Sequence, residues 1–184
     1  MRPPRARTWG PRGHAPVIRV RQGGTGSVAA AGLACFRPGS RTRLIYRYHE
    51  YRGRKGETKA FTWPEYAALV TAAHRQLPGG KIVLIWDNLN THAQAEKLAL
   101  NGRPWLRICR LPPYAPDLNP VEGIWSSLKR GPLANLACPA FSDLTRAFRN
   151  GLRAIQRRPS LIEGCLAETG LTLEMHEQPA DTTL

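Results

Sequence analysis

The sequence predicts an α/β fold, in which a mixed β-sheet is flanked by helices. Three observations support this prediction. The first third of the chain contains short segments in which apolar and polar residues alternate, as in antiparallel strands. From Thr62 onward, helical patterns alternate with compact apolar segments, as in strand–helix units. A hydrophobic fraction of 42% in 184 residues is enough for the core of one domain.

Three strands are expected before the first helix. Residues 1–16 contain four prolines and two glycines, so they should be extended or looped. Apolar and basic residues then alternate over Pro16–Arg21, and a similar alternation returns over Arg41–Tyr48. The small, apolar segment Ser27–Phe36 lies between them, with turn residues on both sides. This order predicts a meander of antiparallel strands.

Helices alternate with strands in the rest of the chain. Thr62, Pro64 and Glu65 form a good helix start, and Pro78-Gly79-Gly80 ends that helix. The elements expected after it are a buried strand, Ile82–Trp86, a helix from about Thr91 to Leu100, a strand, Trp105–Leu111, and helices over Pro120–Leu136, Phe141–Gln156 and Leu161–Glu168. We expect one domain, residues 1–176, followed by a frayed tail, residues 177–184.

Positive charge is the strongest feature of the composition. Lysine and arginine total 27 against 13 acidic residues, which gives a net charge of +14. The residues before Glu50 include ten arginines and no acid. Such a surface attracts the phosphate backbone of a nucleic acid, and a purely solubilising role for the charge is the alternative.

The composition also indicates the cellular compartment in which the protein is expected. No run of about 18 apolar residues and no secretory signal is present, so no membrane association is expected. The four cysteines are scattered and lack the paired spacing of a metal site. They are best interpreted as reduced thiols in a cytoplasmic protein.

One glycine-rich segment offers a different interpretation. The segment Gly24–Ala29 matches the pattern G-x-G-x-x-A of dinucleotide-binding loops and follows a candidate strand. However, that strand contains two arginines, and Gly32 and Pro38 would interrupt the helix that should follow. We therefore regard a dinucleotide site as a minor alternative.

Two acidic residues are the main candidates for chemistry. Asp87 directly follows the apolar strand Ile82–Trp86, and the carboxyl ends of such strands open onto ligand sites. Glu122 lies in the first turn of the helix that begins at Pro120, with 34 residues between it and Asp87. Each has a structural alternative, because Asp87 could cap a helix and Glu122 could complete a capping box with Asn119. If the two carboxylates are close, Mg²⁺ is the ion that they would most naturally bind, and Mg²⁺ supports phosphoryl transfer.

The segments Ile82–His92 and Tyr114–Arg130 resemble the catalytic domain of bacterial insertion-sequence transposases of the mariner superfamily. The shorter segments Thr8–Gly13 and Pro159–Leu161 also look similar. The resemblance implies a ribonuclease-H-like fold with an Asp-Asp-Glu triad whose second and third acids are 34 residues apart. It therefore implies an endonuclease that transfers DNA strands, uses Mg²⁺ with Mn²⁺ as a substitute, and acts on transposon ends and target DNA as a homodimer.

The resemblance also assigns individual residues. Asp87 and Glu122 correspond to the second and third metal-binding acids. Lys129, with the adjacent Arg130, corresponds to a basic position that touches DNA. His92 and Asn119 are candidates for supporting the acids or contacting DNA, and core or capping roles are equally compatible with their positions.

The sequence departs from the family pattern in one respect. In the family, the first acid of the triad lies on a central strand, shortly before the segment that corresponds to Arg2–Gly13 of this chain. In this chain, no acid precedes Glu50. We therefore expect the first central strand to be missing, which would leave edges of the neighbouring strands unpaired. We also expect little activity from this chain alone. The alternative function is a non-catalytic, basic nucleic-acid-binding fragment.

Overall fold

Strands and helices follow one another along the chain largely as the sequence predicts. The computed structural model describes residues 11–14, 17, 26–77, 79–136, 138 and 140–172. The elements are β1 (Ser27–Cys35), β2 (Arg43–Tyr51), α1 (Trp63–Gln76), β3 (Ile82–Trp86), α2 (Asn90–Ala95), the π-helical turn η1 (Glu96–Leu100), β4 (Leu106–Arg110), the 3-10 turn η2 (Pro116–Leu118), α3 (Pro120–Arg130), α4 (Phe141–Gln156) and α5 (Pro159–Ala167). The predicted α/β class, with sheets flanked by helices, is confirmed.

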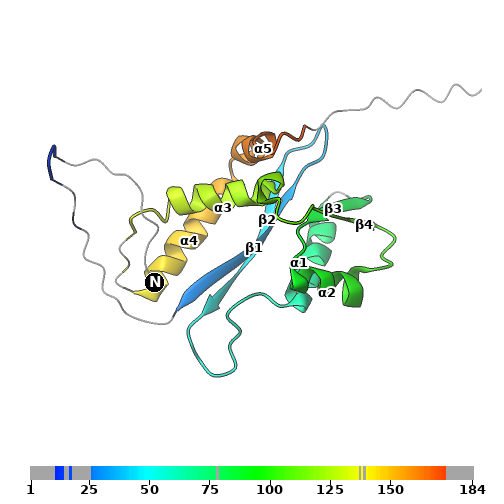
Figure 1. Ribbon diagram of the computed structural model, residues 1–184, viewed down its shortest axis with the longest axis horizontal. Helices are drawn as coiled ribbons and strands as arrows, with labels where there is room; N and C mark the ends of the chain where they lie inside the picture. Colours follow the sequence, from blue (N-terminus) through cyan, green and yellow to red (C-terminus); the bar gives the residue numbers. More distant parts are fainter. Residues whose placement is uncertain are drawn as a thin grey trace, which may run out of the picture.

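A β-hairpin lies at the centre of the molecule. β1 and β2 pair antiparallel over nine residues, from Ser27 opposite Tyr51 to Cys35 opposite Arg43. Figure 1 shows α3, α4 and α5 on one side of this hairpin, and α1, α2, β3 and β4 on the other. The hairpin therefore separates two layers, each with its own apolar cluster.

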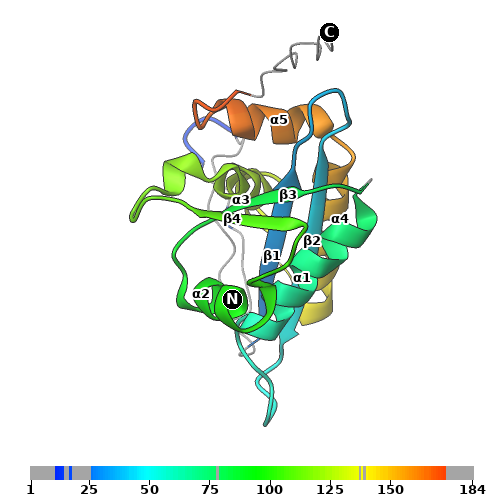
Figure 2. The ribbon, with the colours of Figure 1, turned by 90° about the vertical axis from the view of Figure 1, so that its right-hand side faces the viewer.

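The strands form two sheets instead of the single mixed sheet that was predicted. β3 and β4 pair in parallel, from Ile82 opposite Leu106 to Trp86 opposite Arg110. Figure 2 shows these two strands running across the direction of β1 and β2. Within the described residues, β1 pairs only with β2, and β3 pairs only with β4. Among the described residues, each of the two apolar strands therefore has an edge without a strand partner.

Capping explains where α1 begins. The backbone N–H of Thr62 donates a hydrogen bond of 2.8 Å to Oε2 of Glu65, three residues later. Pro64 occupies the first turn, where its missing N–H has no cost. The helix buries Ala67, Leu69, Val70 and Ala73, so it presents one apolar face to the strands.

Helix α3 packs against the hairpin through a glycine. A Cβ atom at Gly32 of β1 would lie 3.0 Å from the ring of Trp125, so only glycine allows this ring to pack so closely. Ile124 and Leu128 of the same helix are buried in the cluster between the hairpin, α4 and α5. These contacts fix the helix against the sheet.

The prediction that this helix extends to Leu136 is wrong. α3 ends at Arg130, and residues 131–135 form turns. Pro132 disfavours helical geometry at the preceding Gly131. The turn also buries Leu133, whose N–H donates a 3.2 Å hydrogen bond to the carbonyl of Leu128.

The remaining predictions have different outcomes. The predicted strand Pro16–Arg21 and the tail, residues 177–184, lie outside the described residues, apart from Val17. The dinucleotide alternative is wrong, because Ser27–Cys35 after the glycines is a strand and not a helix. In the described part of the chain, no helix has both the length and the apolarity to cross a bilayer.

Candidate functional site

Asp87 is the first residue after β3, at the carboxyl end of the parallel sheet. Side chains alternate along the strand, so that Leu84 and Trp86 are buried whereas Val83 and Ile85 face outward. The N–H of Leu111 donates to the carbonyl of Trp86 at 2.8 Å, which continues the pairing to the last residue of β3. The carboxylate of Asp87 follows this pair and is 52% exposed.

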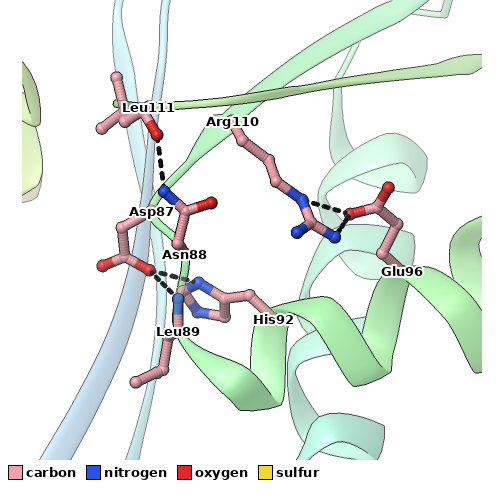
Figure 3. A network of polar contacts seen from close by, with 7 residues as sticks. All are labelled: Asp87, Asn88, Leu89, His92, Glu96, Arg110 and Leu111. Carbon is pink, nitrogen blue, oxygen red and sulfur yellow. Dashed lines mark hydrogen bonds and ion pairs between the residues drawn. The ribbon is translucent and has the colours of Figure 1, made fainter. Parts of the chain in front are cut away.

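The polar groups around Asp87 close the end of the sheet, as Figure 3 shows. The amide Nδ2 of Asn88 donates to the carbonyl of Leu111 at 2.7 Å, which ties the two strand ends together. Oδ1 of Asp87 accepts a 3.1 Å hydrogen bond from the N–H of Leu89. Oδ2 of Asp87 has no partner among the residues that the structure describes.

Asp87 does not cap the helix that follows. Leu89 is the N-cap residue of α2, so neither Asp87 nor Asn90 occupies the cap position, and Asp87 accepts from the N–H of Leu89 itself and not from the first turn of the helix. The capping alternative considered from the sequence is therefore wrong for Asp87. Its carboxylate stabilises the turn between β3 and α2 and leaves one oxygen open.

His92 lies against Asp87 in an aromatic setting. Its Nδ1 is 2.8 Å from Oδ1 of Asp87, at ion-pair distance although outside hydrogen-bond geometry. Its ring stacks on Trp86, with centroids 4.6 Å apart and planes 2° apart, and meets the ring of Tyr66 edge-on at 4.4 Å. The side chain is only 14% exposed, so its rotamer is set by packing. A contact between His92 and DNA stays a prediction.

Tyr66 stays neutral beside this group. Burial raises the pKa of its phenol, and the negative charges of Asp87 and Glu65 raise it further. Nothing local in the sequence connects Tyr66 with Asp87, because the two residues lie on different elements. Asn88, by contrast, directly follows Asp87 in the sequence, so its position next to Asp87 could be recognised from the sequence.

Three buried polar atoms near the strand end have no hydrogen-bond partner among the described residues. They are Nε1 of Trp86, Oγ1 of Thr91 and Nδ1 of His92. Buried donors of this kind normally find a partner. The end of β3 therefore has unused hydrogen-bonding capacity beside the carboxylate of Asp87.

Glu122 is solvent-exposed in the first turn of α3. Oδ1 of Asn119 accepts a 3.1 Å hydrogen bond from the N–H of Val121, which confirms Asn119 as the N-cap. No hydrogen bond joins the Glu122 carboxylate to Asn119, so the capping-box alternative is wrong. The Glu122 carboxylate has no partner in the described chain.

Lys129 and Arg130 are exposed in the last turn of α3. Cations at this end of a helix interact favourably with its dipole, so their position has a structural reason as well. Neither side chain has an acidic partner among the residues that the structure describes. Both are therefore free to meet an anion.

The arrangement brings some predicted residues together and leaves others apart. Asp87 and His92 are in contact, whereas Glu122, Lys129 and Arg130 follow one another along α3. Figure 2 shows a loop between the end of β4 and the start of α3, and this loop contains η2. The described residues contain no group of three or more His, Cys, Asp or Glu side chains that could hold a metal ion.

Comparisons with known proteins identify a family. Residues 1–145 match the family described as DDE superfamily endonuclease. No curated protein matches the chain.

Three solved structures share a limited likeness with the chain. The Mos1 mariner paired end complex with Mn has 17% identity and a TM-score of 0.44, over 92% of this chain and 52% of that one. The Mos1 strand transfer complex has 16% identity and a TM-score of 0.42, over 92% and 51%. The catalytic domain of the Mos1 mariner transposase has 16% identity and a TM-score of 0.40, over 80% and 83%. The chain thus spans about half the length of the Mos1 chains in the two complexes.

Proposed function

Because the chain belongs to the DDE superfamily endonucleases, we propose that it is a transposase domain with a metal–carboxylate site for cutting and transferring DNA strands, and that this activity is impaired in these 184 residues alone because they supply two of the three acids of the family pattern. The observation that carries the proposal is the placement of Asp87, within the matched residues and at the carboxyl end of β3, with an open carboxylate oxygen. Glu122 also lies within the matched residues, exposed and without a partner in the described chain.

The donor atoms of these two residues suit Mg²⁺, with Mn²⁺ as a substitute. Both side chains offer carboxylate oxygens, which are the ligands that hard divalent cations prefer. Mg²⁺ is commonly held by one or two carboxylates, with water and substrate phosphates completing its coordination. Two protein carboxylates are therefore sufficient in number, and Oδ2 of Asp87 is available for the role.

When bound, divalent ions at such a site activate a water or a 3′-hydroxyl group and stabilise the departing oxygen of the DNA phosphate. The protein residues position the acids for this chemistry. Leu89 and His92 hold Oδ1 of Asp87, and Asn88 keeps the strand ends together. Lys129 and Arg130 would bind DNA phosphates from the other end of α3, as charged groups that position the substrate.

The site can be tested by measuring Mn²⁺ binding calorimetrically to purified variants. We expect Asp87→Asn and Glu122→Gln each to weaken binding at least tenfold, because each removes a charged oxygen ligand. Asp117→Asn is the matched control, since Asp117 is an exposed acid five residues before Glu122 with no side-chain partner in the described chain. Equal weakening by all three substitutions would show general charge attraction and defeat the proposed site.

A second candidate function is DNA binding without catalysis. The sequence contains no acid before Glu50, so a polypeptide of these 184 residues supplies two of the three acids of the family pattern. We expect such a polypeptide to nick plasmid DNA weakly or not at all in Mg²⁺ or Mn²⁺. Robust nicking that is lost in Asp87→Ala would contradict this expectation, whereas salt-sensitive DNA binding without nicking would favour the second function.

We further propose that the protein works in the cytoplasm as a homodimer on transposon ends and target DNA. The four cysteines, all free thiols, support a reducing compartment. Sedimentation of the purified protein with and without DNA would test the dimer.

A further inference from the structure

Helix α4 carries a row of arginines that the proposed metal site does not use. Its members are Arg146, Arg149, Arg153 and, at the C-cap, Arg157, and all four are exposed. Successive members are three or four residues apart, so they lie within about 80° of one another around the helix. The row extends over about 16 Å along the helix axis at 1.5 Å per residue. We call these four residues the arginine row.

The row faces away from the core. The opposite face of α4 buries Phe148, Leu152 and Ile155 in the cluster with α3 and the hairpin. Figure 1 shows α4 at the side of the hairpin that is away from β3 and β4. The apolar face of this helix is therefore already occupied, and the arginine row is what it presents to solvent.

The charges of the row are poorly compensated. Asp143 is the one acid in the sequence of α4, and its carboxylate pairs with Arg146. The guanidinium of Arg149 lies over the ring of Tyr48, 6.0 Å from its centroid. Arg153 and Arg157 have no acidic partner in the described part of the chain. Like charges at these spacings repel one another along a helix, and a bound polyanion would relieve that repulsion.

The surroundings of the row favour phosphate groups as its partner. Protein interfaces centre on aromatic and apolar side chains, and membrane-bound helices insert an apolar face. None of the large apolar side chains that are exposed in the described residues lies on α4. Arginine is weakly hydrated and binds phosphate oxygens through paired N–H groups.

We propose that the arginine row binds the phosphate backbone of DNA, away from the metal site and without reading base sequence. The row begins at residue 146, after the last residue of the family match, so it is a feature of this chain beyond the matched region. The choice of DNA as the polyanion rests on the proposed function. Backbone contacts of this kind add affinity and orient the protein on the duplex.

The test is the salt dependence of binding to a short DNA duplex of mixed sequence, in EDTA so that no metal contributes. The variant Arg149→Gln/Arg153→Gln/Arg157→Gln keeps helix propensity and removes three charges. We expect the slope of log K against log salt to become shallower by about 2.7, because each phosphate contact contributes about 0.9.

Two further variants keep the result interpretable. Arg54→Gln/Lys55→Gln/Lys59→Gln removes the same charge from an exposed loop, and we expect it to change the slope by less than one contact. Replacing the same three row arginines by lysine keeps the charge, so that variant should retain most of the original slope. An unchanged slope in the glutamine variant, or an equal change in the loop variant, would overturn the proposal.

The metal site is separable in this experiment. Binding in EDTA measures the contribution of the arginine row without any bound metal ion. The row variant should bind Mn²⁺ normally. Failure of the arginine row would thus leave the proposed metal site untouched, and failure of the metal site would leave DNA binding intact.

Discussion

At the scale of single residues, the two oxygens of the Asp87 carboxylate have different surroundings. Its Oδ1 is committed to Leu89 and His92, and its Oδ2 is open. His92 can keep its position because Trp86 and Tyr66 pack against its ring on two sides. The surroundings of Asp87, which we propose as a metal ligand, therefore depend on an aromatic cluster that holds His92 in place.

Cys35 provides a test of burial at the same scale. Burial raises the pKa of its thiol to about 11, partly opposed by the positive charge of Arg43. A raised pKa means less thiolate, so at pH 8 only about one Cys35 thiol in a thousand should be reactive. We expect iodoacetamide at pH 8 to label the exposed Cys109 well before Cys35, as mass spectrometry of peptides would show.

The labelling of Cys35 should rise steeply as the pH approaches 11. Unfolding in urea is the control, because it should remove the difference between Cys35 and Cys109. Equal labelling of the two thiols in the folded protein would contradict the raised pKa of Cys35.

At the scale of elements, α3 and α4 cross at Gly151 of α4, which has no side chain. A Cβ atom at Gly151 would lie 2.5 Å from Cδ1 of Leu128 and 3.0 Å from Cβ of Pro132. Such distances force neighbouring atoms to move. The crossing therefore requires glycine for its closeness, and the turn after α3 contributes directly to the packing.

We expect Gly151→Ala to lower the free energy of unfolding by about 1–3 kcal/mol through overpacking. Gly164→Ala is the matched control, because Gly164 lies in α5 with no atom within 4 Å of the added Cβ. That substitution should raise stability by about 0.5–1 kcal/mol, since alanine is the better helix former. Urea titration of both variants gives the comparison, and a stabilised Gly151→Ala would refute the close crossing.

At the scale of the whole molecule, the division into two sheets leaves strand edges without partners in the described residues. On β3, Val83 and Ile85 are 62% and 55% exposed beside such an edge. Exposed apolar strands with free edges pair readily with other chains. The molecule should therefore associate with itself through β3 at high concentration.

We expect Ile85→Thr to reduce this self-association, because threonine keeps β propensity and removes exposed apolar surface. Its effect on stability should stay below about 1 kcal/mol, since the side chain is more than half exposed. Leu98→Thr is the control, because Leu98 is 59% exposed but lies in the π-helical turn η1. Light scattering should separate the two, and an equal reduction by both would argue against the strand edge.

Local patterns were sufficient to predict most of the helices and strands, whereas the roles of Asp87 and Glu122 stay predictions. The reciprocal signals at Thr62 and Glu65, the cap at Asn119 and the apolar run before Asp87 act within a few residues, so they can be recognised in the sequence. The arginine excess is likewise a property of composition. These predictions succeeded because helix capping and side-chain alternation are local effects.

Only the tertiary structure decided which segments meet. The placement of Tyr66 and Trp86 around His92, the early end of α3 that buries Leu133, and the separation of β3 from β1 all depend on contacts between distant residues. Strand pairing and core packing are settled by the free energy of the whole fold, in which many alternatives have similar local preferences. The sequence therefore determined most of the helices and strands, and packing determined how they are arranged.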